Sequence, residues 1–294
     1  MTNFLFAHFI GESRLGEQVY FSISKDGNHF YDLNAGNPIL ISNIGEKGAR
    51  DPFLIRDPKT NKVYIIATDL QIHKGLGWEH AQEKGSRDII IWETNDLVNW
   101  QGPRAVTVGV AGAGNVWAPE AVYDKNKEAF LVFWASKVEG KHKIYASYTK
   151  DFVSFDEPFI FVEKDRDVID TTIAYSDDGK YYRLTKDETS SRIIMEYSDE
   201  LVGEYKEIHS PILADLAGVE GPQMYQVTDG TWYLIVDQFA RNLGYMILET
   251  SQLGKKDFVE KLKDEYDFGI MKKRHGSVLA ITKEEYEKLL AHYK

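Results

Sequence analysis

Three acidic residues occupy matching positions in a repeated pattern of this sequence. Asp51, Asp170 and Glu220 each stand at or beside the start of an apolar run that leads into a polar turn. Carboxyl groups crowded together in a partly buried site raise one another's pKa. Hydrolysis of a glycosidic bond needs such a site, because one carboxyl group must donate a proton near neutral pH while another stays ionised to activate water or attack carbon. These residues are therefore the candidate catalytic groups, and the third carboxylate would orient the acid and hold its pKa up.

Each candidate also has a plain structural interpretation. Asp51 precedes Pro52, and Glu220 precedes a Gly-Pro pair, which is typical of turns. Asp57 and Asp124 fall inside polar turns, and we interpret them as turn formers on the opposite face. The three candidates differ from these acids because they share a position at the head of a repeated unit, which predicts that they meet at one end of the fold.

The elements that would position the acids form a repeated hairpin. In residues 50–69, the apolar run Phe53 to Ile55 is followed by a turn rich in Asp, Pro and Asn, and then by the apolar run Val63 to Ala67. Two short apolar runs around such a turn predict antiparallel strands. Similar hairpins begin at Ala118, Asp170 and Gly221.

A second pattern alternates with the hairpins. It is a strand that runs into Ser or Thr, followed by an acid or amide and then by an aromatic residue. It occurs as SISKDGNHF, WETNDLVNW, SYTKDFVSF, EYSDELVGEY and ETSQLGKKDF. A hairpin, this third strand and a short fourth strand make one unit, and four-stranded units recurring every ~50 residues are typical of a β-propeller. A pair of β-sandwiches is the alternative, but a sandwich has no reason to repeat a composite signature.

The fifth unit is divided between the two ends of the sequence. His275–Thr282 matches a first strand, Phe4–Ile10 a second and Gln18–Phe30 a third. Ends that share one blade would close the ring and protect its sheet edges. The sequence therefore predicts an all-β, five-bladed β-propeller, with residues 1–294 as a single catalytic domain. Thr282 and Glu285 predict the capping box of a short C-terminal helix that braces the ring.

The charge and residue composition of the sequence argue against several kinds of partner and site. The formal net charge is -11, which argues against nucleic acid, because phosphate binding needs clustered Lys and Arg. No apolar run is long enough to span a membrane.

Residues 1–6 have neither the basic start nor the apolar centre of a signal peptide, so we expect a cytoplasmic protein. The sequence contains no cysteine, which excludes disulfides and thiolate metal sites. The oligomeric state, including a homo-oligomer, stays open.

Five sequence blocks carry a resemblance to a known family. RDPFLIRD, WAPE, VIDTTIAYSDDGKYY, EGP and RHGS occur in this order and resemble glycoside hydrolase family 43. That family contains five-bladed propellers that act as inverting arabinofuranosidases, arabinanases and β-xylosidases. The resemblance implies that Asp51 is the general base, Asp170 the residue that modulates the pKa of the acid, and Glu220 the general acid.

Further residues around the strand heads are candidates for substrate binding. Trp117 precedes a strand head and Trp78 lies in a long loop, and aromatic faces stack on the C–H surfaces of sugars. Gln223 and Arg274 would hydrogen-bond sugar hydroxyl groups, and Glu120 of the WAPE block would hydrogen-bond the catalytic groups. The two tryptophans could instead be core residues.

The resemblance also implies an ion. Many family members hold a cation, often calcium, in the central channel beside the histidine that corresponds to His275. Water would supply most of its ligands, and its role would be structural or electrostatic. The chemistry itself requires no cofactor. The sequence shows no protein-built calcium cage of the EF-hand type.

These observations favour an exo-acting α-L-arabinofuranosidase on arabino-oligosaccharides, 1,5-linked, or on arabinoxylo-oligosaccharides. The long loop at residues 70–87 would close one end of the site and favour release of single terminal sugars. A β-xylosidase of the same family is the alternative, although many of these carry an extra C-terminal β-sandwich for which this sequence has no room. A second alternative is a sugar-binding propeller without catalysis. Family 32 fructosidases share the propeller, but their Asn-Asp-Pro-Asn and Glu-Cys blocks do not occur here.

Overall fold

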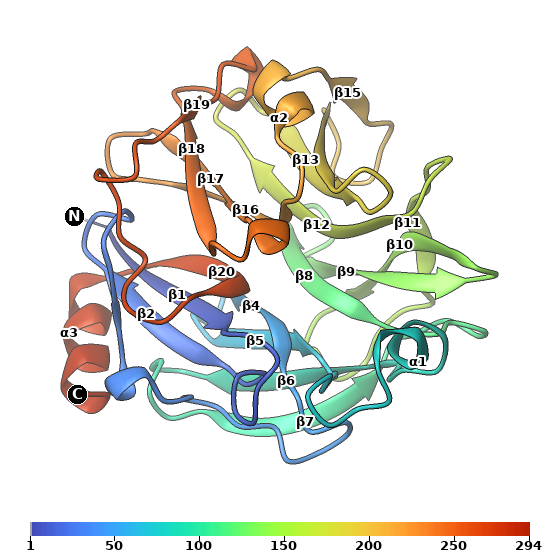
Figure 1. The fold of residues 1–294 in the computed structure, drawn as a ribbon, viewed down its shortest axis with the longest axis horizontal. Helices are drawn as coiled ribbons and strands as arrows, with labels where there is room; N and C mark the ends of the chain where they lie inside the picture. Colours follow the sequence, from blue (N-terminus) through green and yellow to red (C-terminus); the bar gives the residue numbers. More distant parts are fainter. Residues whose placement is uncertain (1) are drawn as a thin grey trace.

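The chain forms five four-stranded antiparallel sheets arranged as blades around a central axis (Figure 1). The computed structural model describes residues 2–294. The predicted all-β, five-bladed propeller is confirmed, including its ring closure by the two ends of the chain and its short C-terminal helix. None of the helices within residues 2–294 combines the length and the apolar character needed to cross a membrane.

Four blades are built from consecutive strands, with the first strand of each nearest the axis. Blade one comprises β4 (Arg50–Arg56), β5 (Val63–Thr68), β6 (Asp88–Thr94) and β7 (Gln101–Thr107). Blade two comprises β8 (Trp117–Asp124), β9 (Ala129–Val138), β10 (Lys141–Thr149) and β11 (Phe159–Val162). Blade three comprises β12 (Val168–Tyr175), β13 (Tyr181–Asp187), β14 (Arg192–Ser198) and β15 (Lys206–Ile208). Blade four comprises β16 (Glu220–Gln226), β17 (Trp232–Asp237), β18 (Tyr245–Thr250) and β19 (Val259–Glu260).

Blade five joins both ends of the chain. Its strand order is β20 (Arg274–Ile281), β1 (Asn3–Phe9), β2 (Tyr20–Ser24) and β3 (Phe30–Asp32), so the red strand β20 lies beside the blue strand β1 (Figure 1). Helix α3 (Lys283–His292) follows, and Thr282 and Glu285 form the predicted capping box. Glu285 also makes two hydrogen bonds with Arg56 of blade one. The helix therefore braces the junction between the last blade and the first.

The second strands are buried on both faces. Every residue of β5 and of β17 is buried, and the two strands read VYIIAT and WYLIVD. Each blade is covered by a neighbour on either side, so a strand in its middle needs a continuous apolar run rather than alternation. One apolar cluster spans blades five and one and includes residues of α3. The packing of blade against blade thus holds the first strands in place around the axis.

Short helical segments lie in the loops and were not predicted from the sequence. Helix α1 (Trp78–Glu83) lies between β5 and β6, in the loop where the sequence predicted only an extension, and α2 (Pro211–Asp215) lies between β15 and β16. Single turns of 3₁₀ helix are η1 (Asn34–Gly36), η2 (Phe239–Arg241) and η3 (Leu253–Lys255). Both α1 and η2 contribute side chains to the cavity described below.

The innermost strands share an irregularity at their heads. In each of blades one to four, the pairing with the second strand shifts register there, and a residue with positive φ lies at the shift. These residues are Asp51 (φ 51°), Ala118 (φ 46°), Asp170 (φ 49°) and Gly221 (φ 54°). In blade five, the pairing of β1 with β20 shifts opposite His275. Such bulges turn a side chain out of the regular pleat and are frequent beside active sites.

One serine ties the closing strand to the head of blade one. The buried Ser277 hydroxyl accepts a hydrogen bond of 2.7 Å from the Leu54 N–H and donates one of 3.1 Å to the Pro52 carbonyl. Ser277→Ala should lower the free energy of unfolding by about 2 kcal/mol, because it leaves a buried N–H without a partner. Urea denaturation measures this.

The exposed Ser154 provides a matched control. Ser154→Ala should change the free energy of unfolding by less than about 0.5 kcal/mol. Equal stability of the two variants would contradict a role for Ser277 in joining the blades.

Candidate active site

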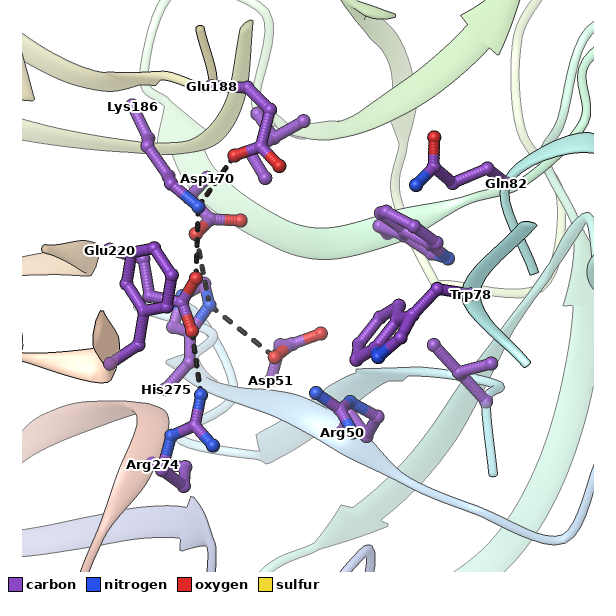
Figure 2. Close-up of a pocket in the computed structure, with 14 residues that line it drawn as sticks. Arg50, Asp51, Trp78, Gln82, Asp170, Lys186, Glu188, Glu220, Arg274 and His275 are labelled. Atoms are coloured by element: carbon purple, nitrogen blue, oxygen red, sulfur yellow. Dashed lines mark hydrogen bonds and ion pairs between the residues drawn. The ribbon is translucent and has the colours of Figure 1, made fainter. Parts of the chain in front are cut away.

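The strand heads of all five blades meet at a cavity of about 290 Å³ on one end of the axis (Figure 2). Asp51, Asp170 and Glu220 all line it, so the structure brings the three predicted acids together. The remaining lining residues are Arg50, Leu70, Trp78, Gln82, Trp117, Ile169, Lys186, Glu188, Phe239, Arg274 and His275. The cavity is concave and mixes aromatic with charged side chains, as expected of a site for a small polar ligand.

Asp51 is fixed by blade two as well as by its own blade. Its Oδ2 accepts a hydrogen bond of 2.8 Å from the Thr68 hydroxyl, and that hydroxyl in turn accepts the Ala118 N–H at 2.8 Å. The Asp51 side chain is 14 % exposed. Its other oxygen faces the cavity side of the ring, toward His275. A carboxylate held this way has one oxygen left for a water molecule.

His275 lies between two of the acids. Its Nδ1 is 3.4 Å from Asp51 Oδ1 and 3.8 Å from Asp170 Oδ2 (Figure 2). The ring packs against Gly221, where an added Cβ would meet the imidazole at 2.7 Å. Glycine is therefore needed in the EGP block both for its positive φ and for the space that the ring occupies.

Asp170 is buried and is the deepest of the three acids. Its side chain is 7 % exposed, and its Oδ2 accepts the Gly221 N–H at 3.1 Å. Burial raises the pKa of Asp170 to about 6, and the neighbouring Glu220 and Asp51 add to the rise, against the opposing effect of His275 and Lys186. Asp170 therefore exchanges a proton close to neutral pH.

Glu220 is held between two cations. Its Oε2 accepts a hydrogen bond of 3.0 Å from Lys186 Nζ, and its Oε1 accepts one of 2.8 Å from Arg274 Nη2 (Figure 2). Burial acts to raise the pKa of Glu220, but Lys186 and Arg274 together outweigh it and lower the pKa below its usual value. Arg274 is itself anchored by Asp237, whose Oδ2 lies 2.5 Å from Arg274 Nε. In this arrangement Glu220 is ionised.

The predicted aromatic residues form one wall of the cavity. Trp78 of α1 and Trp117 of β8 contact edge to face, with ring centroids 6.0 Å apart. Arg50 lies over the Trp78 ring at 5.0 Å and is held by buried Glu17 at 2.8 Å. Trp78 is 43 % exposed and lines the cavity. This wall offers apolar ring faces to a sugar while the opposite side of the cavity offers charges.

Two of the residues predicted to bind substrate lie outside the cavity lining. Glu120 and Gln223 are 4 % and 3 % exposed. Gln223 Nε2 donates to Thr172 Oγ1 at 2.8 Å, and Glu120 Oε2 has no hydrogen-bond partner among the residues that the structure describes. Burial raises the pKa of Glu120 well above its usual value, and nearby Asp170 adds to the rise. Both side chains are buried and neither lines the cavity, so their contact with substrate stays a prediction. Arg274, which was also predicted to bind substrate, does line the cavity.

His275 is the residue beside which the resemblance implies a channel cation. Within residues 2–294, no group of three or more His, Cys, Asp or Glu side chains is arranged to hold a metal ion. His275 directs Nδ1 to the two carboxylates instead. The side chains of residues 2–294 therefore do not themselves build a cation cage. The water-coordinated channel cation stays a prediction.

Sequence reasoning missed a second group of cavity residues. Lys186 lies near the end of β13, where the equivalent pairing positions of blades one, two and four hold Thr68, Ala135 and Asp237, and this difference was the available signal. Glu188 lies two residues later. Gln82 and Phe239 belong to α1 and η2, which carry no repeat signature. Lys186 lies at the end of a second strand, and the other three lie between second and third strands, where the blades differ in length and sequence.

A five-bladed propeller with three carboxyl groups at one end of its axis is the architecture of a propeller glycoside hydrolase. A family profile described as a probable glycosyl hydrolase domain, related to family 43, matches residues 1–287. The chain belongs to this family, which confirms the resemblance and the predicted enzyme class.

Individual known proteins are similar to this chain in sequence or in structure. The chain is 32% identical over 212 residues to an α-L-arabinofuranosidase of Bifidobacterium longum subsp. longum. This match covers 64% of the chain but only 20% of that protein, so the chain spans about a fifth of the relative's length. Among solved structures, a family 43 β-1,3-galactosidase with galactodeoxynojirimycin is similar at TM-score 0.63 and 11% identity, with 90% of this chain and 92% of that chain covered. The native arabinanase of Bacillus subtilis is similar at TM-score 0.53 and 16% identity, with 82% of each chain covered. At these identities the two structures support the fold.

Asp170→Asn should remove activity and yet stabilise the protein at neutral pH. The native pKa of Asp170 is about 6, above its ordinary value of 3.8. Between these values the native state binds more protons than the unfolded chain, so stability falls as pH rises through this window. Asparagine carries no charge, so the variant does not lose stability as pH rises through this window. We expect the free energy of unfolding to exceed that of the wild type by about 2 kcal/mol at pH ~7.5.

The difference should shrink to a fraction of this value at pH ~4, where Asp170 is protonated in the native state and about half protonated in the unfolded chain. Urea denaturation at the two pH values measures it. A stability difference that does not change with pH would contradict the assigned cause.

Proposed function

We propose that this protein is an inverting, exo-acting α-L-arabinofuranosidase that releases terminal arabinose from arabino-oligosaccharides, 1,5-linked, or from arabinoxylo-oligosaccharides. The observation that carries the proposal is the convergence of Asp51, Asp170 and Glu220 on one cavity in a chain of the family 43-related domain. The similarity to the Bifidobacterium arabinofuranosidase supports the sugar.

Asp51 has the contacts of a general base. Thr68 fixes one of its oxygens, and the other, 3.4 Å from His275 Nδ1, faces the cavity and would accept a proton from water. That water would attack the anomeric carbon on the face opposite the leaving group, which inverts the configuration. The C–O bond to water forms as the glycosidic C–O bond breaks. Asp51 takes the proton of the attacking water.

Glu220 would act as the general acid and give its proton to the leaving oxygen. Asp170 lies behind it, connected through the Gly221 N–H and facing His275. A charged Asp170 favours protonated Glu220, because like charges in a buried site oppose joint ionisation. This matches the proposed role of Asp170 as the residue that modulates the acid.

The shape of the cavity supports release of single sugars. Helix α1 and the loop around it stand at one side, where Trp78 and Gln82 line the cavity. A wall on one side leaves room for a terminal residue and blocks a chain that continues in both directions. We therefore assign the wall to the non-reducing end of the substrate.

Proton NMR of the anomeric signals on a 1,5-linked arabino-oligosaccharide should show arabinose released one residue at a time and first seen as the β-anomer. Inversion at the α-linked carbon gives this anomer directly. Xylobiose serves as the comparison substrate. Faster cleavage of xylobiose would identify a β-xylosidase, release of internal fragments would overturn the exo assignment, and cleavage of neither would favour a sugar-binding propeller.

Glu220→Gln should lower kcat on the natural oligosaccharide by about 10³-fold, because an alkoxide leaving group needs the proton. On 4-nitrophenyl α-L-arabinofuranoside the loss should be much smaller, since nitrophenolate leaves without protonation. The exposed Glu204→Gln is the control and should retain wild-type rates on both substrates. Equal losses on both substrates would contradict the acid role.

A further inference from the structure

The contacts of Glu220 raise a question that the proposed function does not answer. Both of its oxygens accept hydrogen bonds from cations, Lys186 on Oε2 and Arg274 on Oε1. A general acid must carry a proton on an oxygen that faces the leaving group. Both cations therefore oppose protonation of Glu220, and release by one of them would favour it.

The two cations differ in how firmly they are held. Arg274 is fixed by a second carboxylate, Asp237, which is fully buried, and its guanidinium lies 5.6 Å from the Phe9 ring. Lys186 has a second partner of another kind. Its Nζ lies 2.6 Å from Glu188 Oε2, and the Glu188 side chain is 42 % exposed. The lysine is thus shared between a buried acid and an acid at the cavity surface.

The side chains around Lys186 restrict its ammonium group to the space between Glu188 and Glu220. Its side chain is 3 % exposed, and Nζ lies 4.5 Å from the centroid of the Phe239 ring of η2. Figure 2 shows the ammonium between Glu188 and Glu220, with Asp170 beside it. An ammonium on a flexible stem moves between neighbouring acceptors more readily than a guanidinium with several fixed contacts.

We propose that Lys186 is a positioning residue that controls the protonation of Glu220, holding it as a carboxylate until the ammonium is drawn onto Glu188. The inference rests on the proposed function, in which Glu220 is the acid. Lys186 keeps its own proton throughout and makes no bond to the substrate. When it turns to Glu188, Glu220 Oε2 loses a cation, takes a proton from solvent and becomes competent to donate it.

Other charged groups also face Glu220, and the proposal leaves them in place. They are Arg274 and His275 of β20, Asp170 of β12 and Asp237 of β17. All four side chains remain in a Lys186 or Glu188 variant, but loss of the ammonium also removes a charge that lowers the pKa of Asp170. The titration of Glu220 itself therefore distinguishes the effect of the lysine on Glu220 from its effect on Asp170.

Two substitutions should move the pH profile in opposite directions. The upper pH limit of kcat/KM reports the group that must be protonated. Lys186→Met removes the cation and should move this limit upward by about one pH unit. Glu188→Gln removes the competing acceptor, leaves Lys186 on Glu220 and should move the limit downward. Lys186→Arg keeps the charge and should stay closer to the wild type than Lys186→Met.

Lys143 and Glu163 provide the matched control pair. They form an ion pair of 2.8 Å in blade two, with side chains 19 % and 48 % exposed, and do not line the cavity. Lys143→Met and Glu163→Gln should leave the profile unchanged. Lower activity at every pH in Lys186→Met, with an unmoved limit, would overturn the proposal, as would shifts of Lys186→Met and Glu188→Gln in the same direction.

A measurement without substrate separates this inference from the proposed function. The ¹³C signal of the Glu220 carboxyl group in labelled protein, assigned with Glu220→Gln, should titrate at higher pH in Lys186→Met than in the wild type. If no glycoside is cleaved but this shift is seen, the proposed activity fails while the control of Glu220 by Lys186 stands. If arabinose is released but the titration is the same in both proteins, the lysine proposal fails alone.

Discussion

The site depends on a backbone constraint that recurs at the head of each innermost strand. Asp51 and Asp170 have left-handed backbone conformations, and the strand pairing shifts register at both. A regular strand would point successive side chains alternately to its two faces, and it could not turn carboxyl groups from separate blades toward one cavity. The bulge redirects them, at a backbone cost of order 1 kcal/mol for each non-glycine residue. The packing between blades maintains this conformation, so the buried second strands are as much a part of the site as the acids.

Once gathered, the carboxyl groups are contacted by nitrogen-bearing side chains from other strands. His275 faces Asp51 and Asp170, whereas Arg274 and Lys186 hold Glu220. The result is two different electrostatic environments within one cavity. Asp170 has a raised pKa because burial dominates, and Glu220 a lowered one because its two cations dominate. Acid and base chemistry at one pH requires carboxyl groups whose environments differ, and here the difference comes from which blade supplies the neighbouring charge.

The repeat made most of the fold predictable. Hairpins with a third strand, recurring along the chain, carry periodic apolar runs because every blade solves the same packing problem, and the split fifth blade was recognisable from His275–Thr282 and Phe4–Ile10. The convergence of the three acids was predictable for the same reason, since Asp51 and Asp170 occupy equivalent positions and Glu220 directly precedes the matching Gly221. Lys186, Glu188 and Phe239 were not predicted, because they lie where blades differ and their partners are set only by three-dimensional neighbours.

The assignment of Glu120 and Gln223 shows another limit of sequence reasoning. A strand head and the next few residues look alike in sequence, but the bulge and the pleat decide which side chains reach the cavity. Both residues lie behind the acids, among buried polar groups. Predicting which of two neighbouring side chains reaches the cavity requires the backbone conformation at the strand head. The positive φ of Ala118 could not be predicted, because alanine is not a residue type that favours it.

The order of the strands along the chain has a consequence for biosynthesis. Four complete blades and all three carboxyl groups precede β20, which carries Arg274 and His275. A nascent chain on the ribosome would hold the acids before the imidazole and guanidinium that organise them have been translated. Domains fold during synthesis as their segments emerge, so insertion of β20 beside β1 would be the event that converts an inert intermediate into a competent enzyme. Catalytic competence and completion of the ring would then appear together, and a chain that stalls before residue 274 would remain silent.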